Sequence, residues 1–480
     1  MRGGLASPSC PKVSHARRPT SNSTRRNCRR GKTVVRMTST TAVPTWGELG
    51  RAHTPTTSPT VKRLTEEAAA RARGEGPPHQ DNKLRLFGAN ESDVRVTFYR
   101  DHAGVSWCPY CQKLWIMLEE KQIPYRVEKI NMRSYGDKPQ AFLEKIPSGL
   151  LPVVEIDGQL ITESLVIMQI LEREFPGRTT LPEDKFEAAN VLLRLERQLF
   201  SDWCGFVFRP SMPGPLGARA GFEKTLDKVD EALGETPGPW FLGGDDPSIV
   251  DFQYVSHVER MNASVLYWKG LQLRGTECWS NIEKWLLAFE ARPNYQATKS
   301  DYYTHVMDIP PQYGPGVPDR NSSVDEAVAI IGGEKSWRLP VNLTADGFEP
   351  LPESMNRGVE DARHEAAHKL ITNYENIVKF ACRGMGEPGR KQFGAPLADP
   401  YAVPNLNYET RVDECLRRVA KALIEGTAQP GESSVSPSKD AKSVGKCLSY
   451  LRDRVGVPRD MSYPAAMQLR AHLNWCIDSL

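Results

Sequence analysis

Apolar and polar residues alternate most clearly between residues 94 and 175. Val94–Tyr99 and Tyr125–Ile130 alternate as half-buried strands do. Pro152–Ile156 and Gln159–Ile161 read as a hairpin, because the Asp-Gly pair between them is a typical two-residue turn. Helical spacing predicts helices over residues 109–121 and 163–175. The pattern therefore predicts an α/β domain in which a βαβ unit precedes a ββα unit.

The rest of the chain has a mainly helical pattern. Residues 183–292 are helical throughout, and Ser248 with Asp251 has the spacing of a capping box. A third region, residues 317–480, is called the C-terminal extension here. Its expected helices cover residues 360–383 and 408–426, with two short ones starting at residues 441 and 464. A Ser/Pro/Gly/Lys-rich insert, residues 426–443, predicts a mobile loop.

The amino end of the chain differs in composition from the rest. Before Glu48 there are ten basic residues and no acidic one, together with many Ser and Thr residues. This composition is typical of an organelle transit peptide, so residues 1–47 are expected to be disordered and largely removed. Val34–Met37 resembles a plastid processing site, and a mitochondrial address or a basic RNA-binding tail are the alternatives. Residues 48–92 are expected to form a linker arm.

Net charge and hydropathy exclude two classes of protein. The ten basic residues of the leader exceed the whole-chain net charge of +3, so the remaining chain is net acidic. A net acidic body argues against a nucleic-acid-binding protein. No apolar run approaches the roughly 18 residues of a membrane-spanning helix.

The candidate chemistry lies at two neighbouring cysteines, Cys108 and Cys111. Cys108 follows a strand and begins a helix, where unpaired N–H groups and the helix dipole stabilise a thiolate. Pro109 suits the first helical position, and Cys111 lies one turn further on. A zinc half-site would need a second Cys or His pair. The pattern therefore predicts redox or nucleophilic use, with Cys108 as the nucleophile and no metal.

The other cysteines are scattered singly and are expected to pack as small hydrophobic residues: Cys10, Cys28, Cys204, Cys278, Cys382, Cys415, Cys447 and Cys476.

Cys108-Pro-Tyr-Cys111 is similar to the glutaredoxin motif, and residues 94–303 resemble the glutathione transferase superfamily. The resemblance implies a thioredoxin-like glutathione-binding domain over residues 93–178 and an all-helical domain over residues 183–305, followed by the helical extension. It also implies the glutathione site. Lys145–Val154 resembles the segment that leads into the superfamily's cis-proline, and Glu163-Ser164 resembles the pair that grips the γ-glutamyl group. The residues assigned to glutathione on this basis are Lys138, Leu151, Pro152, Glu163 and Ser164.

A cysteine nucleophile favours reduction over conjugation, because it forms a mixed disulfide with glutathione. The resemblance thus implies a cysteine-type enzyme with glutathione as co-substrate. Its second substrate would be a small disulfide, a glutathionylated protein or dehydroascorbate. The leader and the extension resemble the iota class of photosynthetic organisms, whose usual motif has Trp where this chain has Tyr110. The alternatives are a conjugating transferase, or a binding module that holds a hydrophobic ligand or, as a homodimer, an iron–sulfur cluster.

His364–His368 fits the H-E-x-x-H pattern of zinc peptidases. Helical spacing places the apolar residues, among them Ala366 and Leu370, on one face and both histidines on the opposite, polar face. Lys369 adds a charge directly after the second histidine. We therefore expect solvated histidines and no zinc.

Overall fold

The computed structural model describes residues 43–102, 107–132, 135–212, 214, 217–343, 349–389, 396–429 and 439–480. Residues 44–480 form one compact unit. Most of the expected transit peptide, residues 1–42, lies outside the described residues, as do residues 430–438 of the expected mobile loop.

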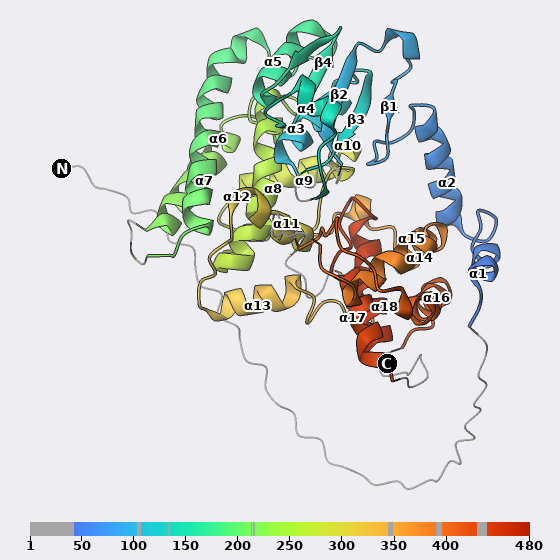
Figure 1. Ribbon diagram of the computed structural model, residues 1–480. Helices are drawn as coiled ribbons and strands as arrows, with labels where there is room; N and C mark the ends of the chain where they lie inside the picture. The colour runs from blue at the N-terminus through green and yellow to red at the C-terminus, as the bar shows by residue number, and fades with distance from the viewer. Residues whose placement is uncertain are drawn as a thin grey trace. The chain divides into compact units, whose positions relative to one another are not determined.

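The sheet contains five strands in the order β1-β3-β2-β4-β5 (Figure 1). β2 and β3 are parallel, and the other neighbouring pairs are antiparallel. The predicted hairpin is confirmed, with its turn at Asp157-Gly158. The strands are β1 (Leu84–Arg85), β2 (Val96–Asp101), β3 (Tyr125–Ile130), β4 (Val153–Ile156) and β5 (Gln159–Ile161).

Helices make up most of the remaining described chain. α8 is the central helix, since nearly all its residues are buried and it packs against α3, α6, α11 and α13. The helices are α1 (Trp46–Ala52), α2 (Pro59–Ala72), α3 (Pro109–Glu120), α4 (Gln140–Lys145), α5 (Ser164–Glu174), α6 (Phe186–Val207), α7 (Ala218–Gly234), α8 (Ile249–Lys269), α9 (Ser280–Glu290), α10 (Pro293–Gln296), α11 (Tyr302–Asp308), α12 (Pro310–Tyr313), α13 (Ser322–Ile331), α14 (Val359–Thr372), α15 (Tyr374–Ala381), α16 (Glu409–Glu425), α17 (Ala441–Arg452) and α18 (Tyr463–Asp478).

The predicted capping box at the start of α8 is confirmed. The backbone N–H and the hydroxyl of Ser248 donate to the same carboxylate oxygen of Asp251, at 2.8 and 2.6 Å. The same side chain also accepts from the Phe241 N–H and the Trp285 indole N–H. One buried carboxylate thus fixes both the start of α8 and its position against α9.

The segment expected to be a linker arm is packed structure, and its first helix begins inside the leader expected over residues 1–47. α1 begins at Trp46, whose ring stacks on Tyr374 and whose indole N–H donates to Asp413 at 2.6 Å. α2 packs against α14, where Arg63 forms an ion pair with Asp361. β1 adds to the edge of the sheet. The expectation failed because α1 and α2 pack against distant residues of the extension and β1 pairs with β3 of the sheet.

The C-terminal extension contains more helices than expected (Figure 1, orange to red). The helix predicted over residues 360–383 ends at Asn373, whose backbone leaves the helical region (φ −135°), and α15 follows. A 3₁₀ turn, η5 (Cys382–Met385), continues from α15. The predictions for α16 and α17 are confirmed within two residues, and α18 spans 16 residues rather than forming a short helix.

Candidate functional site

The topology of the sheet gathers the candidate residues at one edge. β2 and β3 are parallel, so β2 leads towards Cys108 and β3 towards Lys138 at the same edge. β4 is antiparallel to β2, and its first residue, Val153, pairs with Tyr99 near the end of β2. Leu151 and Pro152 therefore lie at this edge as well. Continuing the β4–β5 register by two residues sets Pro152 opposite Glu163.

Cys108 occupies the N-cap of α3, as predicted. Its sulfur accepts a hydrogen bond from the Cys111 N–H at 3.4 Å, and its side chain is 4% exposed. Cys111 is fully buried, and its thiol donates a hydrogen bond to the Cys108 sulfur. Burial and the Cys108 thiol raise the pKa of the Cys111 thiol well above its usual value, so Cys111 stays protonated near neutral pH. The geometry makes Cys108 the better placed nucleophile of the two.

Two buried polar side chains hold α3 in register with α8. The Gln112 amide donates to Glu259 at 2.8 Å and accepts from Arg260 at 2.7 Å. Lys113 donates to Gln253 at 3.0 Å. A helix that carries a reactive sulfur needs a fixed position, and these contacts supply it.

Lys113 also places a cation close to the reactive sulfur, and sequence analysis missed it. Its ammonium lies 4.8 Å from the centre of the Tyr110 ring and interacts electrostatically with Cys108. Burial lowers the pKa of Lys113 to about 8. Electrostatic interactions with Glu196 and Cys108 act in the opposite direction and raise this pKa. The sequence shows a lysine two residues after Cys111, but the burial of this lysine depends on α6 and α8.

The residues assigned to glutathione surround the start of β4. The Leu151–Pro152 peptide bond is cis, as the resemblance implied. Lys138 is half-buried and its stem packs against Gly149, where an added Cβ would lie 3.3 Å from Lys138 Cδ. Gly149 also has a positive φ of 61°, so glycine suits this position on two grounds. The structure thus brings Lys138 next to the segment that carries Leu151 and Pro152.

Glu163 has an unusual backbone conformation. It precedes α5 with φ 65° and ψ 108°, is exposed, and its carbonyl accepts the Ile167 N–H at 2.9 Å. A non-glycine residue with such angles costs on the order of 1–3 kcal/mol, and such residues cluster at ligand sites. Ser164 follows as the first residue of α5, where backbone N–H groups are unpaired. Glu163 and Ser164 are therefore placed to meet a charged ligand.

An aromatic face lies on the other side of Cys108. The Tyr110 and Phe200 rings lie 5.5 and 4.8 Å from the His257 ring, and Phe200 also contacts Tyr313 at 5.8 Å. His257 is hydrogen-bonded to Glu196 at 2.9 Å. Burial lowers the pKa of His257 to about 4, so the ring is neutral at pH 7. These side chains come from α3, α6, α8 and α12. Apart from Tyr110, which lies between the two cysteines of the motif, they carry no motif that could have revealed them.

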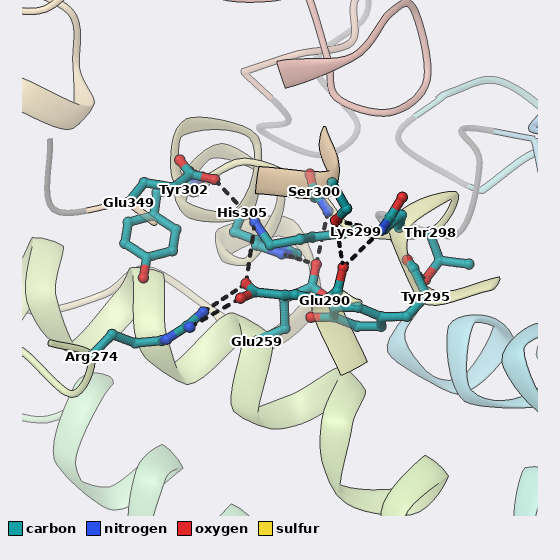
Figure 2. A network of polar contacts seen from close by, with 12 residues as sticks. Glu259, Arg274, Glu290, Tyr295, Thr298, Lys299, Ser300, Tyr302, His305 and Glu349 are labelled. Carbon is teal, nitrogen blue, oxygen red and sulfur yellow. Dashed lines mark hydrogen bonds and ion pairs between the residues drawn. The ribbon is translucent and has the colours of Figure 1, made fainter. Parts of the chain in front are cut away.

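A buried polar network connects α8 with the C-terminal extension (Figure 2). Glu259 on α8 accepts from the Ser300 N–H at 2.8 Å and lies 2.7 Å from His305. Burial opposes ionisation of Glu259, but these bonds and the charge of Arg260 lower its pKa to about 2. The Ser300 hydroxyl donates to the carbonyl of Val457 in the extension.

Three more contacts complete the junction. The Tyr302 N–H donates to Glu349 at 2.9 Å, and Lys299 lies 3.5 Å from the same carboxyl group (Figure 2). Arg470 on α18 pairs with Asp301 at 2.6 Å, and both side chains are buried. The helix that carries Cys108 is therefore linked to the extension through α8 by continuous buried polar contacts.

The expectation of solvated histidines in the H-E-x-x-H motif is wrong for His364. Its side chain is buried, with Nδ1 3.0 Å from the Ser58 hydroxyl and Nε2 3.2 Å from the Ile424 carbonyl oxygen. His368 is half-buried, and burial lowers its pKa. Helical spacing assigned these residues to solvent because it could not show that α2 covers this face.

The glutamate of the motif also has a structural partner. Glu365 accepts from both the backbone N–H and the hydroxyl of Ser462, each at 2.7 Å, at the start of α18. Among the described residues there is no group of three or more His, Cys, Asp or Glu side chains that could hold a metal. In the same part of the chain, no helix is long and apolar enough to cross a membrane.

Comparison with known proteins covers the sheet domain and the helices that follow it. The model of the glutathione S-transferase N-terminal domain matches residues 107–174, and that of the C-terminal domain matches residues 187–296. Glutathione S-transferase omega-1 of Mus musculus is 30% identical over 223 residues, which cover 45% of this chain and 84% of that protein. Glutathione S-transferase DHAR2 of Arabidopsis thaliana is 25% identical over 193 residues, covering 40% of this chain and 84% of that protein.

Among solved structures, the glutathione transferase Omega 3C of Trametes versicolor matches with a TM-score of 0.37 and 25% identity, over 49% of this chain and 95% of that chain. The two family models together contain all seven residues proposed for the site. Neither model reaches residues 317–480. The two family models, together with the Mus musculus relative that is 30% identical over 84% of its length, show that the chain belongs to the glutathione S-transferase family.

Proposed function

We propose that this protein is a cysteine-type, glutathione-dependent thiol–disulfide oxidoreductase. The observation that carries the proposal is Cys108 at the N-cap of α3, with the Cys111 N–H directed at its sulfur at 3.4 Å. Backbone donors at this position stabilise a thiolate, whereas a hydroxyl nucleophile would activate glutathione for conjugation.

The reaction runs in two exchange steps. The Cys108 thiolate attacks the glutathionyl sulfur of a mixed disulfide, so the substrate thiolate leaves and Cys108 becomes glutathionylated. The thiolate of a second glutathione then attacks the glutathionyl sulfur, which releases glutathione disulfide and restores Cys108. The net reaction converts one mixed disulfide and one free glutathione into the substrate thiol and one glutathione disulfide. Protonated Cys111 is not needed in either step.

Lys138, Leu151, Pro152, Glu163 and Ser164 are proposed to bind glutathione. Glutathione carries two carboxylates and an ammonium group, so its site needs cationic, anionic and N–H donors. Lys138 supplies the cation, Glu163 the anion, and the start of α5 at Ser164 supplies N–H groups. The backbone N–H and C=O of Leu151 precede the first paired residue of β4 and are placed for ladder-like bonds to the peptide.

The aromatic face of Tyr110, Phe200 and Tyr313 is proposed to bind the second substrate. The mixed disulfide of a protein or of a small thiol, or dehydroascorbate, fits this assignment. Dehydroascorbate is included because the chain is similar to glutathione S-transferase DHAR2 of Arabidopsis thaliana.

The test is a panel of assays on the reduced protein. We expect glutathione-dependent reduction of a small mixed disulfide and of a glutathionylated peptide. The rate of each reaction is measured by coupling the glutathione disulfide that it forms to a reductase. Conjugation of glutathione to an electrophilic aromatic compound should be far slower. Fast conjugation without disulfide reduction would support the conjugating alternative. A brown protein with visible absorption bands after anaerobic purification would support an iron–sulfur cluster.

Two further assignments rest on sequence. We infer the iota class, supported by the paired cysteines and the long extension. We also infer a plastid address, supported by the acid-free basic leader, with the mitochondrion as the alternative. A fluorescent fusion of residues 1–60 would test the address by its location in leaf cells.

A further inference from the structure

Four cysteines of the C-terminal extension, which sequence analysis regarded as single, lie in two pairs. The Cys382 thiol is hydrogen-bonded to the Cys447 thiol, and the Cys415 thiol to the Cys476 thiol. All four side chains are 0% exposed, and none is in a disulfide. Each pair joins residues more than 60 positions apart in sequence. Packing alone can explain a single buried cysteine. Two thiol–thiol contacts raise the further question of which pair can form a disulfide more readily.

The two pairs differ in the structure that carries them. Cys415 and Cys476 lie within the long helices α16 and α18, so their backbones are held by helical hydrogen bonds on both sides. Cys382 begins the four-residue turn η5, while Cys447 lies on α17. A disulfide needs its sulfur atoms about 2.05 Å apart, closer than a hydrogen bond holds them. A short turn can make that shift at less cost than a helix interior.

Close backbone contact holds η5 against α17. A Cβ added to Gly384 would lie 2.5 Å from the Lys446 carbonyl oxygen and 2.9 Å from Cys447 Cα, so only glycine fits there. The Cys382 carbonyl accepts the Asn405 N–H at 3.1 Å. The turn therefore presents Cys382 to Cys447 in a defined position.

The surroundings favour ionisation of one thiol of this pair. Cys447 accepts a hydrogen bond from the Cys382 thiol and another from the Met385 N–H, and these lower its pKa against the effect of burial. The Cys382 thiol, as the donor, has its pKa raised. The pair thus consists of an attacking sulfur and a neighbour that retains its proton.

A surface hollow of about 640 Å³ adjoins η5 and α17, although neither cysteine lines it. Gly384 and Lys446, which contact or adjoin Cys447, line it together with Lys442 and Arg454. The sulfur atoms themselves are covered, so a reagent as large as glutathione disulfide has no path to them in this conformation. A small oxidant such as hydrogen peroxide is therefore the class of reagent to test.

We propose that Cys382 and Cys447 form a peroxide-sensitive dithiol that closes reversibly to a disulfide joining η5 to α17. The Cys447 thiolate attacks one peroxide oxygen, the O–O bond breaks, and the departing hydroxide takes a proton to become water. Cys382 then loses its proton, and its sulfur displaces hydroxide from the sulfenic acid on Cys447. The two thiols lose two electrons and two protons, and one peroxide becomes two waters. A dithiol reductant reverses the change.

Differential alkylation of the full-length protein tests this proposal. The reduced protein is exposed to hydrogen peroxide, unfolded, blocked with a light maleimide, then reduced and labelled with a heavy maleimide. Peptide mass spectrometry follows every cysteine separately. We expect equal heavy label at Cys382 and Cys447, and a cross-linked peptide lighter by two hydrogen atoms than the reduced pair. Cys415 and Cys476 are the internal control. The pKa of Cys415 is also lowered, by the Cys476 thiol, but both residues lie inside long helices, so their cross-link should form roughly tenfold more slowly.

Variants sharpen the result. Cys447→Ser should leave Cys382 reduced, while Cys476→Ser should leave the Cys382–Cys447 cross-link unchanged. The proposal is overturned if Cys382 stays reduced in the wild type, if Cys447 proceeds to sulfinic acid without a cross-link, or if both pairs oxidise at the same rate. Since the readout is a peptide and not turnover, it is independent of the activity proposed for Cys108.

Discussion

Two of the thiol pairs in the described part of the chain arise in opposite ways. Cys108 and Cys111 are three residues apart, and one helix start positions both. Cys382 and Cys447 come from a turn and a helix that only the packing of the extension brings together. Both pairs are buried and both have a thiol–thiol contact, but in the first pair a helix-start N–H is also directed at the Cys108 sulfur, while the second pair joins a turn to a separate helix.

This difference separates two uses of the same functional group. A thiolate at a helix N-terminus is ready for a substrate that arrives from solution, because its stabilisation is local and its second thiol is dispensable. A buried thiol pair lacks room for a large substrate, and its partner thiol is within reach. The first pair is suited to exchange with glutathione and the second to closing on itself.

The largest expected effect distinguishes the two cysteines of the first pair. Cys108→Ser should abolish reduction of a glutathionylated peptide, because no other sulfur takes the glutathionyl group. Cys111→Ser should retain most of the activity, since a second glutathione releases the first. Initial rates with the coupled reductase assay measure both. A dead Cys111→Ser variant would replace the one-thiol mechanism by a dithiol relay.

The second effect concerns the junction between the two regions. Asp301→Asn retains the cap on the Thr304 N–H but leaves the Arg470 charge buried without its partner. Breaking a buried pair typically costs about 3–5 kcal/mol in unfolding free energy. Urea unfolding followed by tryptophan fluorescence measures the change. Arg338→Ala, which breaks the exposed pair with Asp478, is the control and should cost less than about 1 kcal/mol.

A smaller effect is expected at the glutathione site. Lys138→Ala removes a charge-assisted contact worth about 1.5–3 kcal/mol, so kcat/KM for glutathione should fall roughly ten- to hundredfold. Attack of Cys108 on an uncharged disulfide should change little. Lys145→Ala, on neighbouring α4, is the matched control, because that lysine is half-exposed and pairs with Glu155. Equal losses with both substrates would contradict the assignment of Lys138.

Lys113 predicts a pH-dependent effect of several-fold. Its pKa, lowered by burial to about 8, means that the ammonium is present below pH 8 and is lost as pH rises through that value. Alkylation of Cys108 by iodoacetamide should therefore be several-fold faster in the wild type than in Lys113→Met at pH 6.5. The ratio should approach one at pH 9.5. A ratio that stays constant with pH would show that Lys113 acts only through packing.

The smallest effect is expected for the leader. A protein lacking residues 2–37 should keep its unfolding midpoint and its disulfide reductase rate, because the leader has no apolar periodicity. Parallel thermal unfolding and rate measurements on the two proteins test this. Loss of folding or activity would contradict the transit-peptide interpretation.

The sequence by itself determined the features that depend on neighbouring residues. The Asp157-Gly158 hairpin, the capping box at Ser248 and the placement of Cys108 at a helix start each follow from a few consecutive positions. The alternating strands β2 and β3 follow from their period. Such features are set by backbone conformation and local hydrogen bonding, which act over one or two turns of chain.

The tertiary structure alone decided what depends on distant partners. It turned the expected linker into α1, α2 and β1, because their apolar partners lie in the extension and the sheet. It buried His364 beneath α2 and brought Lys113 beside Cys108. It also paired Cys382 with Cys447. Periodicity shows which face of a helix is apolar, but it does not show which segment covers the other face. That covering segment decides whether a polar side chain is solvated, buried or reactive.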